Sequence, residues 1–208
     1  LTPSHGLIAK VIEELTIPLH VLIRPRSGNF TYTKEELDIM LRDITYCKSV
    51  GCAGVVSGAL EKDFSVDTQI TKQLIAAAQG MEFTFHRAFD WVPNPMEAIL
   101  VLAEMGSTRV LSSGQQTTAL KGISLLKELN ETYGKIIQVM PGGGINTENC
   151  SAFKKAGFKM VHCSASKKMQ TLQIKPLVAM HSQKFFEEGI ISRSDKVIIQ
   201  EIIKKLNG

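Results

Sequence analysis

The sequence predicts an α/β fold in which parallel strands alternate with helices. Six short apolar segments each end in polar or glycine-rich residues, and stretches with apolar residues three or four positions apart lie between them. This alternation is typical of βα units rather than of a β-sandwich. The strands are expected over residues 20–26, 53–59, 83–90, 109–114, 136–144 and 159–165.

Helices are expected over residues 34–50, 67–79, 94–105, 119–132 and 147–155. Thr33 precedes the first of these, and Glu36 follows three residues later, which is the spacing of a capping box. Ser194 is expected to cap a final amphipathic helix. The apolar residues of that helix are Ile198, Ile199, Ile202, Ile203 and Leu206.

Composition fits one globular domain over residues 1–208. Of the 208 residues, 44% are hydrophobic, which is enough to bury a substantial core. The net charge of +4 is modest, and the basic C-terminal stretch is interpreted as a solvated helix face, so no nucleic-acid partner is expected. No segment approaches the ~18 uninterrupted apolar residues of a membrane span, so no membrane partner is expected either.

The most informative segment is the strand that ends in His86, Arg87 and Asp90. Strict alternation places Phe83 and Phe85 on one face of this strand, toward helices, and His86 on the opposite face, which lines an interior. Ionisable groups then collect where the strand ends. This segment alone leaves two interpretations open, a functional site and an ion-paired strand end that only orders a loop.

Four cysteines, Cys47, Cys52, Cys150 and Cys163, lack the spacing of a zinc finger. Reduced thiols in a cytosolic protein are the expectation. Cys47 and Cys52 are the most ligand-like pair. Buried structural thiols and metal ligands both remain possible roles, with the structural role favoured because unpaired cysteine is among the most buried residue types.

The chain resembles the CutC family of copper-homeostasis proteins. The resemblance lies in residues 23–30, 84–90, 111–114, 140–145 and 162–165, in the order and spacing of the family. It implies a TIM-like (β/α) barrel, a cytoplasmic homo-oligomer and copper binding. Family members carry a further N-terminal segment with two strands, so we expect a barrel domain that lacks the first two of the family's eight strands and is N-terminally incomplete.

In such barrels the loops after the strand carboxyl ends form the site. The expected catalytic residues are His86, Arg87, Arg24 and Arg26. The expected ligand-binding residues are Ser112, Ser113, Gly142, Gly143, Gly144, His162 and Ser164. Three alternatives stay open: the arginines as structural ion pairs, the triglycine as a tight turn, and the histidines as satisfied core residues.

Two functions follow from the sequence. The resemblance implies a copper-homeostasis protein that binds Cu(I) and acts in intracellular copper handling or tolerance. Cu(I) prefers sulfur ligands, so Cys52 and Cys163 are the candidate metal residues, with Cys47 and Met140 as further donors. The alternative is an enzyme that uses the arginine-rich mouth on a small anionic or phosphorylated substrate, because guanidinium binds oxyanions and repels cations. The sequence assigns no reaction type, so whether the protein is an enzyme stays open.

Overall fold

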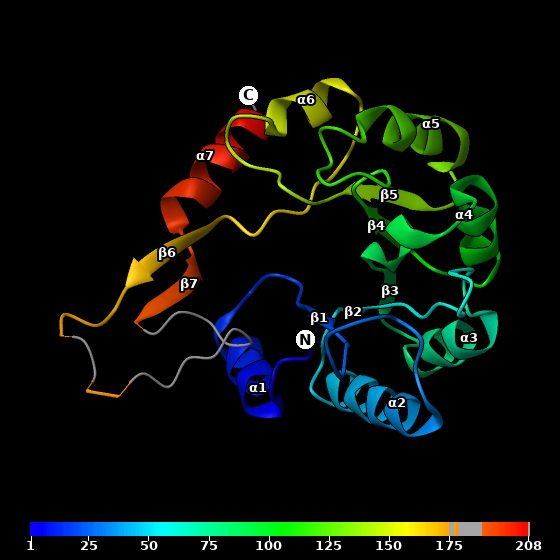
Figure 1. Cartoon of the computed structure of the whole chain (residues 1–208), viewed down its shortest axis with the longest axis horizontal. Helices are drawn as coiled ribbons and strands as arrows, with labels where there is room; N and C mark the ends of the chain where they lie inside the picture. The colour runs from blue at the N-terminus through cyan, green and yellow to red at the C-terminus, as the bar shows by residue number, and fades with distance from the viewer. Residues whose placement is uncertain (175–176, 179–188, 208) are drawn as a thin grey trace.

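The computed structural model describes residues 1–174, 177–178 and 189–207. Five parallel strands form one sheet in the order β1-β2-β3-β4-β5 (Figure 1). The strands are β1 His20–Leu22, β2 Gly54–Ser57, β3 Glu82–Phe85, β4 Arg109–Ser112 and β5 Gln138–Pro141. Each strand pairs with its neighbour in the sequence, so all five carboxyl ends meet at one edge of the sheet. The predicted α/β class is confirmed.

Helices surround the convex side of this curved sheet (Figure 1). The helices of the described chain are α1 His5–Glu14, α2 Lys34–Ser49, α3 Thr68–Ala77, the 3-10 helix η1 Arg87–Trp91, α4 Pro95–Glu104, α5 Ile123–Tyr133, α6 Cys150–Lys155 and α7 Lys196–Asn207. Of these, η1 lies at the end of β3, and α7 lies beside α6 (Figure 1). Thr33 and Glu36 form the predicted capping box at the start of α2. No helix in the described part of the chain is long and apolar enough to cross a membrane.

The two faces of the sheet differ in character. Val55, Phe83 and Val110 belong to the main core and are almost completely buried. A cavity of about 610 Å³ is lined by residues at the alternate strand positions, among them Val56, Thr84 and Arg109. Within the described residues β1 is paired with β2 only, and the sheet is not closed into a hydrogen-bonded barrel.

The predicted sixth strand is mostly absent. Of residues 159–165, only His162 pairs with the sheet, through a parallel bridge to Gly142 and a 2.8 Å hydrogen bond from its N–H to the Pro141 carbonyl. Ala165 then adopts a left-handed conformation with φ of 44°. The chain turns there into an antiparallel hairpin, β6 Ser166–Gln170 with β7 Ile190–Ser194, instead of extending the parallel sheet.

The predicted final helix is present as α7, but its cap is Asp195 and not Ser194. The Asp195 carboxylate accepts hydrogen bonds from the N–H groups of Val197 at 2.8 Å and Ile198 at 3.1 Å. Ser194 is the last residue of β7, and its hydroxyl donates to the Ser164 carbonyl. The cap therefore lies one residue later than predicted, because the strand continues through Ser194.

Candidate functional site

A cavity of about 280 Å³ lies near the carboxyl ends of the strands. It brings together four of the predicted site residues, Arg24, His86, Arg87 and His162. Arg24 follows β1, and His86 and Arg87 follow β3. His162 lies beyond α6 and reaches the same edge of the sheet through its bridge to Gly142, which follows β5. The complete lining is His20, Leu22, Arg24, Phe30, Val56, His86, Arg87, Leu111 and His162.

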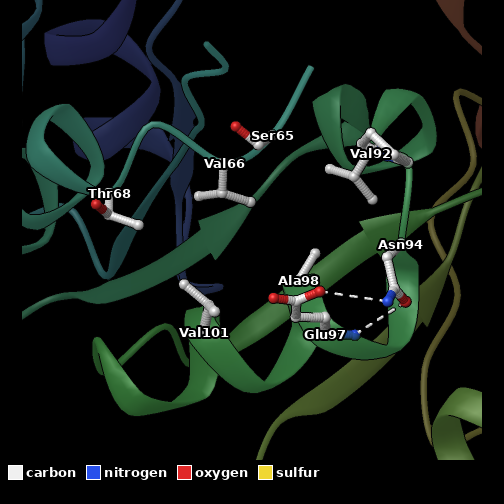
Figure 2. A pocket seen from close by; sticks show the side chains of 9 residues that line it. Ser65, Val66, Thr68, Val92, Asn94, Glu97, Ala98 and Val101 are labelled. Atoms are coloured by element: carbon white, nitrogen blue, oxygen red, sulfur yellow. Dashed lines mark hydrogen bonds between the residues drawn. The ribbon is translucent and has the colours of Figure 1, made fainter. Parts of the chain in front are cut away.

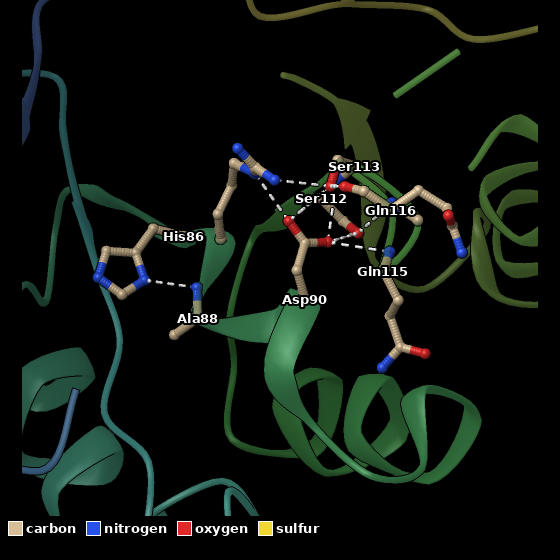
Figure 3. A network of polar contacts seen from close by, with 9 residues as sticks. His86, Ala88, Asp90, Ser112, Ser113, Gln115 and Gln116 are labelled. Atoms are coloured by element: carbon tan, nitrogen blue, oxygen red, sulfur yellow. Dashed lines mark hydrogen bonds and ion pairs between the residues drawn. The ribbon is translucent and has the colours of Figure 1, made fainter. Parts of the chain in front are cut away.

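His86 is buried and held in one orientation. Its Nδ1 accepts a 3.3 Å hydrogen bond from the Ala88 N–H (Figure 3). The ring also needs the absence of a side chain at Gly58, where a Cβ atom would lie 2.9 Å from Nδ1. Because Nδ1 is an acceptor, the proton of the neutral ring is on Nε2. That atom is buried and has no hydrogen-bond partner among the described residues.

The charge state of His86 follows from its surroundings. Burial lowers the pKa of His86 to about 3, and the positive charge of Arg24 contributes in the same direction. The imidazole is therefore neutral at neutral pH. The ring carries no positive charge of its own, and its one N–H donor, on Nε2, has no partner among the described residues.

Arg24 supplies a cation that has no carboxylate partner within ion-pair distance among the described residues. Its Nη2 donates a 2.8 Å hydrogen bond to the Gly28 carbonyl. The guanidinium carbon lies 4.6 Å from the centroid of the Phe30 ring, a cation–π contact. Its Nε is buried and has no partner in the described part of the chain.

Arg26 is engaged differently from Arg24. Its guanidinium forms an ion pair with Glu36 and donates to the carbonyls of Ser27, Asn29 and Thr31. These five hydrogen bonds match the five N–H groups of an arginine. Arg26 thus holds the loop after β1 together and does not line the cavity.

Arg87 is positioned by a polar network that joins two βα units (Figure 3). Its Nε donates to Asp90 at 2.7 Å, and its Nη2 donates to the Ser113 hydroxyl at 2.7 Å. The Asp90 carboxylate also accepts hydrogen bonds from the Ser112 hydroxyl at 2.6 Å and from the backbone N–H groups of Ser113 and Gln115. Ser112 and Ser113 therefore order this corner and orient Arg87.

The triglycine loop lies beside Arg87. Gly143 and Gly144 have φ angles of 113° and 72°, which favour glycine. A Cβ atom on Gly143 would lie 3.3 Å from the guanidinium carbon of Arg87, so the loop backbone closely approaches this arginine. Gly142 precedes them and forms the bridge to His162.

His162 and Ser164 lie in different surroundings, although only one residue separates them in the sequence. His162 lines the cavity. Burial of the ring is the main cause that lowers the pKa of His162, and the positive charge of Arg87 adds to it. Ser164 is exposed and does not line the cavity; its hydroxyl lies 3.2 Å from that of Ser166.

The cysteines fall into two separate pairs. Burial and then the nearby Cys52 raise the pKa of Cys47 to about 12. Burial and then Cys150 raise the pKa of Cys163. The first pair adjoins α2 and the second adjoins α6, which lie at opposite ends of the sheet (Figure 1), so Cys52 and Cys163 are not brought together. The described residues contain no group of three or more His, Cys, Asp or Glu side chains placed to hold a metal ion.

Sequence reasoning did not single out Phe30 and Trp91. Phe30 lines the cavity under Arg24, and Trp91 packs edge-on against Phe30 with ring centroids 4.9 Å apart. Single aromatic residues in a sequence are most often core residues, and no periodic pattern marks these two. Only the fold shows that Phe30 lines the cavity and that Trp91 packs behind it.

Comparisons with known proteins agree with this architecture. The profile of the CutC family matches residues 1–167. A CutC family protein from Enterobacter sp. (strain 638) is 45% identical over 167 residues, which cover 80% of this chain and 67% of the relative. One from Glaesserella parasuis serovar 5 (strain SH0165) is 36% identical over 208 residues, 100% of this chain and 85% of the relative. The chain thus spans about two thirds of the length of several relatives.

Solved structures extend the likeness to the fold. A CutC protein from Streptococcus agalactiae, named after copper homeostasis, superposes with a TM-score of 0.74 at 35% identity, over 77% of this chain and 80% of the other. The aldolase QR15 superposes with a TM-score of 0.61 at 12% identity, over 76% of this chain and 73% of the other, which is a likeness of fold alone. From its profile match, its sequence relatives and its structural likeness, the chain belongs to the CutC family.

Proposed function

We propose that the cavity between Arg24, His86 and Arg87 binds a small anionic, phosphate-bearing substrate. The observation that carries the proposal is a pair of buried donors, Nε of Arg24 and Nε2 of His86, which have no partner among the described residues. A buried donor left unpaired costs about 1–3 kcal/mol. A ligand oxygen that accepts from both atoms would remove this cost.

The charge of the cavity supports an anion over a cation. Arg24 and Arg87 both line it, and Asp90, the carboxylate beside Arg87, is already bound by several donors. Guanidinium groups bind oxyanions through pairs of N–H groups. A volume of about 280 Å³ suits a small ligand.

The same groups could support catalysis, with the reaction type open. A neutral His86 that donates its Nε2 proton in a hydrogen bond can stabilise negative charge developing on a substrate oxygen. With a pKa of about 3, it is a donor rather than a strong base at neutral pH. Arg24 and Arg87 would neutralise the anion, whereas Arg26, Ser112 and Ser113 would hold the surrounding loops.

Phosphate binding tests this proposal. Inorganic phosphate should raise the melting temperature of the protein in a concentration-dependent way, and Arg24→Gln should weaken phosphate binding about tenfold or more in calorimetric titration. The matched control is Arg42→Gln, an exposed arginine paired with Asp38, which should leave phosphate binding unchanged. If the phosphate effect persists in both Arg24→Gln and His86→Gln, the proposed site is not where the anion binds.

Copper handling is a second candidate, favoured by the two thiol pairs and by the name of the Streptococcus agalactiae relative. Thiolates select Cu(I), but each thiol must first lose its proton, and the raised pKa values of Cys47 and Cys163 oppose this. Competition for Cu(I) against a chromogenic chelator tests the role. Cys52→Ser and Cys163→Ser should each lower the stoichiometry if these pairs bind copper, and unchanged binding in both variants would contradict these ligands.

A further inference from the structure

We infer that the ligand of this cavity carries a planar aromatic ring attached to its phosphate group. The inference rests on the proposed function and specifies its substrate class. It comes from a continuous series of aromatic rings that begins in the cavity wall and ends at the surface, formed by Phe30, Trp91 and Phe64.

The ring series is close-packed. Phe30 lies 4.8 Å from the ring of His86 and 4.9 Å from Trp91, measured between centroids. Trp91 lies 5.8 Å from Phe64, edge to face. Phe30 is buried, whereas Trp91 and Phe64 expose 46% and 48% of their surface. An exposed aromatic surface therefore starts one ring away from the cation and the histidine N–H donor.

The loop around Phe64 holds its backbone in an unusual conformation, and the ring stays exposed. Phe64 has a φ of 68°, a left-handed conformation that is unusual for a bulky residue. Its N–H donates to the Glu61 carbonyl at 3.1 Å, and the Glu61 N–H donates to the Ser65 carbonyl at 2.8 Å. A strained backbone that exposes an apolar ring gains little for folding, and such strain is concentrated at ligand-binding sites.

Another cavity is lined by the sequence neighbours of this aromatic pair, and its charge does not suit an anion. It has about 280 Å³ and is lined by the residues that directly follow Phe64 and Trp91, Ser65 and Val92, together with α4 (Figure 2). Among the described residues that line it, the charged one is Glu97, which accepts a hydrogen bond from the Asn94 side chain. The phosphate group is therefore assigned to the side of Arg24, and the ring to Trp91.

This arrangement fits the phosphate monoester of an aromatic or heteroaromatic group. The phosphate would accept hydrogen bonds from Arg24 and His86, and the ring would pack against the exposed face of Trp91. Aromatic pairs at centroid distances of about 4.5–7 Å stabilise a complex beyond the area they bury. An alkyl phosphate makes the first set of contacts and lacks the second.

Three probes separate the two parts of the ligand: inorganic phosphate, ethyl phosphate and phenyl phosphate. In calorimetric titration we expect phenyl phosphate to bind about tenfold more tightly than ethyl phosphate. Trp91→Ala should remove this preference and leave the affinity for inorganic phosphate within about twofold. Ile136→Ala provides the matched control and should keep the preference. Ile136 is another exposed apolar residue, but it lies before the start of β5, whereas Trp91 lies after the carboxyl end of β3.

The sequence offers an independent readout, because Trp91 is its single tryptophan. Phenyl phosphate should change the tryptophan emission of the wild-type protein at concentrations where ethyl phosphate does not. Equal affinity for phenyl and ethyl phosphate would overturn the inference and leave phosphate binding standing. A preference for phenyl phosphate that survives Trp91→Ala and Phe64→Ala would overturn the assigned position of the ring. Failure of all three probes to bind would contradict the proposed function itself.

Discussion

The hydroxyl of Ser112 donates a 2.6 Å hydrogen bond to the carboxylate of Asp90 and so joins the end of β4 to the helix η1 that follows β3. The Asp90 side chain is only 7% exposed, and it also binds Arg87. The orientation of a cavity arginine thus depends on a carboxylate that does not itself line the cavity.

Asp90→Asn should lower the free energy of unfolding by about 3 kcal/mol, because a buried charged acceptor is lost while its donors remain. Urea denaturation followed by circular dichroism measures this change. Asp38→Asn is the control: its ion pair with Arg42 is exposed, and the expected change is below about 1 kcal/mol. Similar losses in both variants would show that the Asp90 network contributes little.

His86 should make stability fall with acidification. Its folded pKa of about 3 lies below the ordinary value of 6.5, so between these values the unfolded chain binds more protons than the folded one. The contribution of His86 to the free energy of unfolding is therefore fully present above pH 6.5. It is lost as the pH falls toward 3, at up to about 1.4 kcal/mol per pH unit. His20 and His162, whose pKa values are also lowered, act in the same direction.

His86→Gln isolates that contribution from those of the other two histidines. Urea denaturation of both proteins between pH 4 and pH 7 should give a shallower slope of unfolding free energy for the variant. Parallel slopes would mean that His86 is accessible to protons in the folded protein.

Gly143→Ala should destabilise the protein through both backbone strain and contact. The residue has a φ of 113°, and a Cβ atom would lie 3.2 Å from the Ser113 Cβ and 3.3 Å from the Arg87 guanidinium carbon. The expected loss is about 1–3 kcal/mol. Gly80→Ala separates the two causes, because Gly80 has a φ of 90° and nothing within 4 Å of its Cβ position. Thermal denaturation should show the smaller loss for Gly80→Ala, and the reverse order would exclude crowding at the triglycine loop.

Thiol reactivity should distinguish Cys163 from the other cysteines. Cys47, Cys52 and Cys150 are buried, whereas Cys163 is half-buried. Labelling of the native protein with a chromogenic disulfide reagent near pH 8 should therefore show one faster thiol, which Cys163→Ser removes. Four equally fast thiols would indicate that the regions around α2 and α6 both open readily, since Cys150 is buried in α6 and a pKa of about 12 keeps the Cys47 thiol protonated in the folded state.

Much of the fold could be predicted from the sequence, because strands and helices have different apolar periods. The failure at residues 159–165 has a physical reason: a strand needs a pairing partner, and the left-handed turn at Ala165 directs the chain into a separate hairpin. Periodicity also could not place the cap at Asp195, because it does not show that β7 continues through Ser194.

The site was predictable in position but not in the role of each residue. Parallel strands collect the residues that follow them, so Arg24, His86 and Arg87 were expected together, and the structure places them around one cavity. The difference between Arg24 and Arg26 depends on hydrogen bonds to loop carbonyls and to Glu36, which no strand pattern encodes.

The orientation of the His86 ring depends on a second position in the chain, Gly58. Any larger residue at 58 would bring its Cβ atom within 3.0 Å of both the His86 imidazole and the Phe85 ring. A genetic screen for loss of function should therefore score position 58 as severely as position 86, although glycine offers no side chain for chemistry. Intolerance to mutation at Gly58 would then mark the space that the imidazole occupies rather than a group that takes part in a reaction.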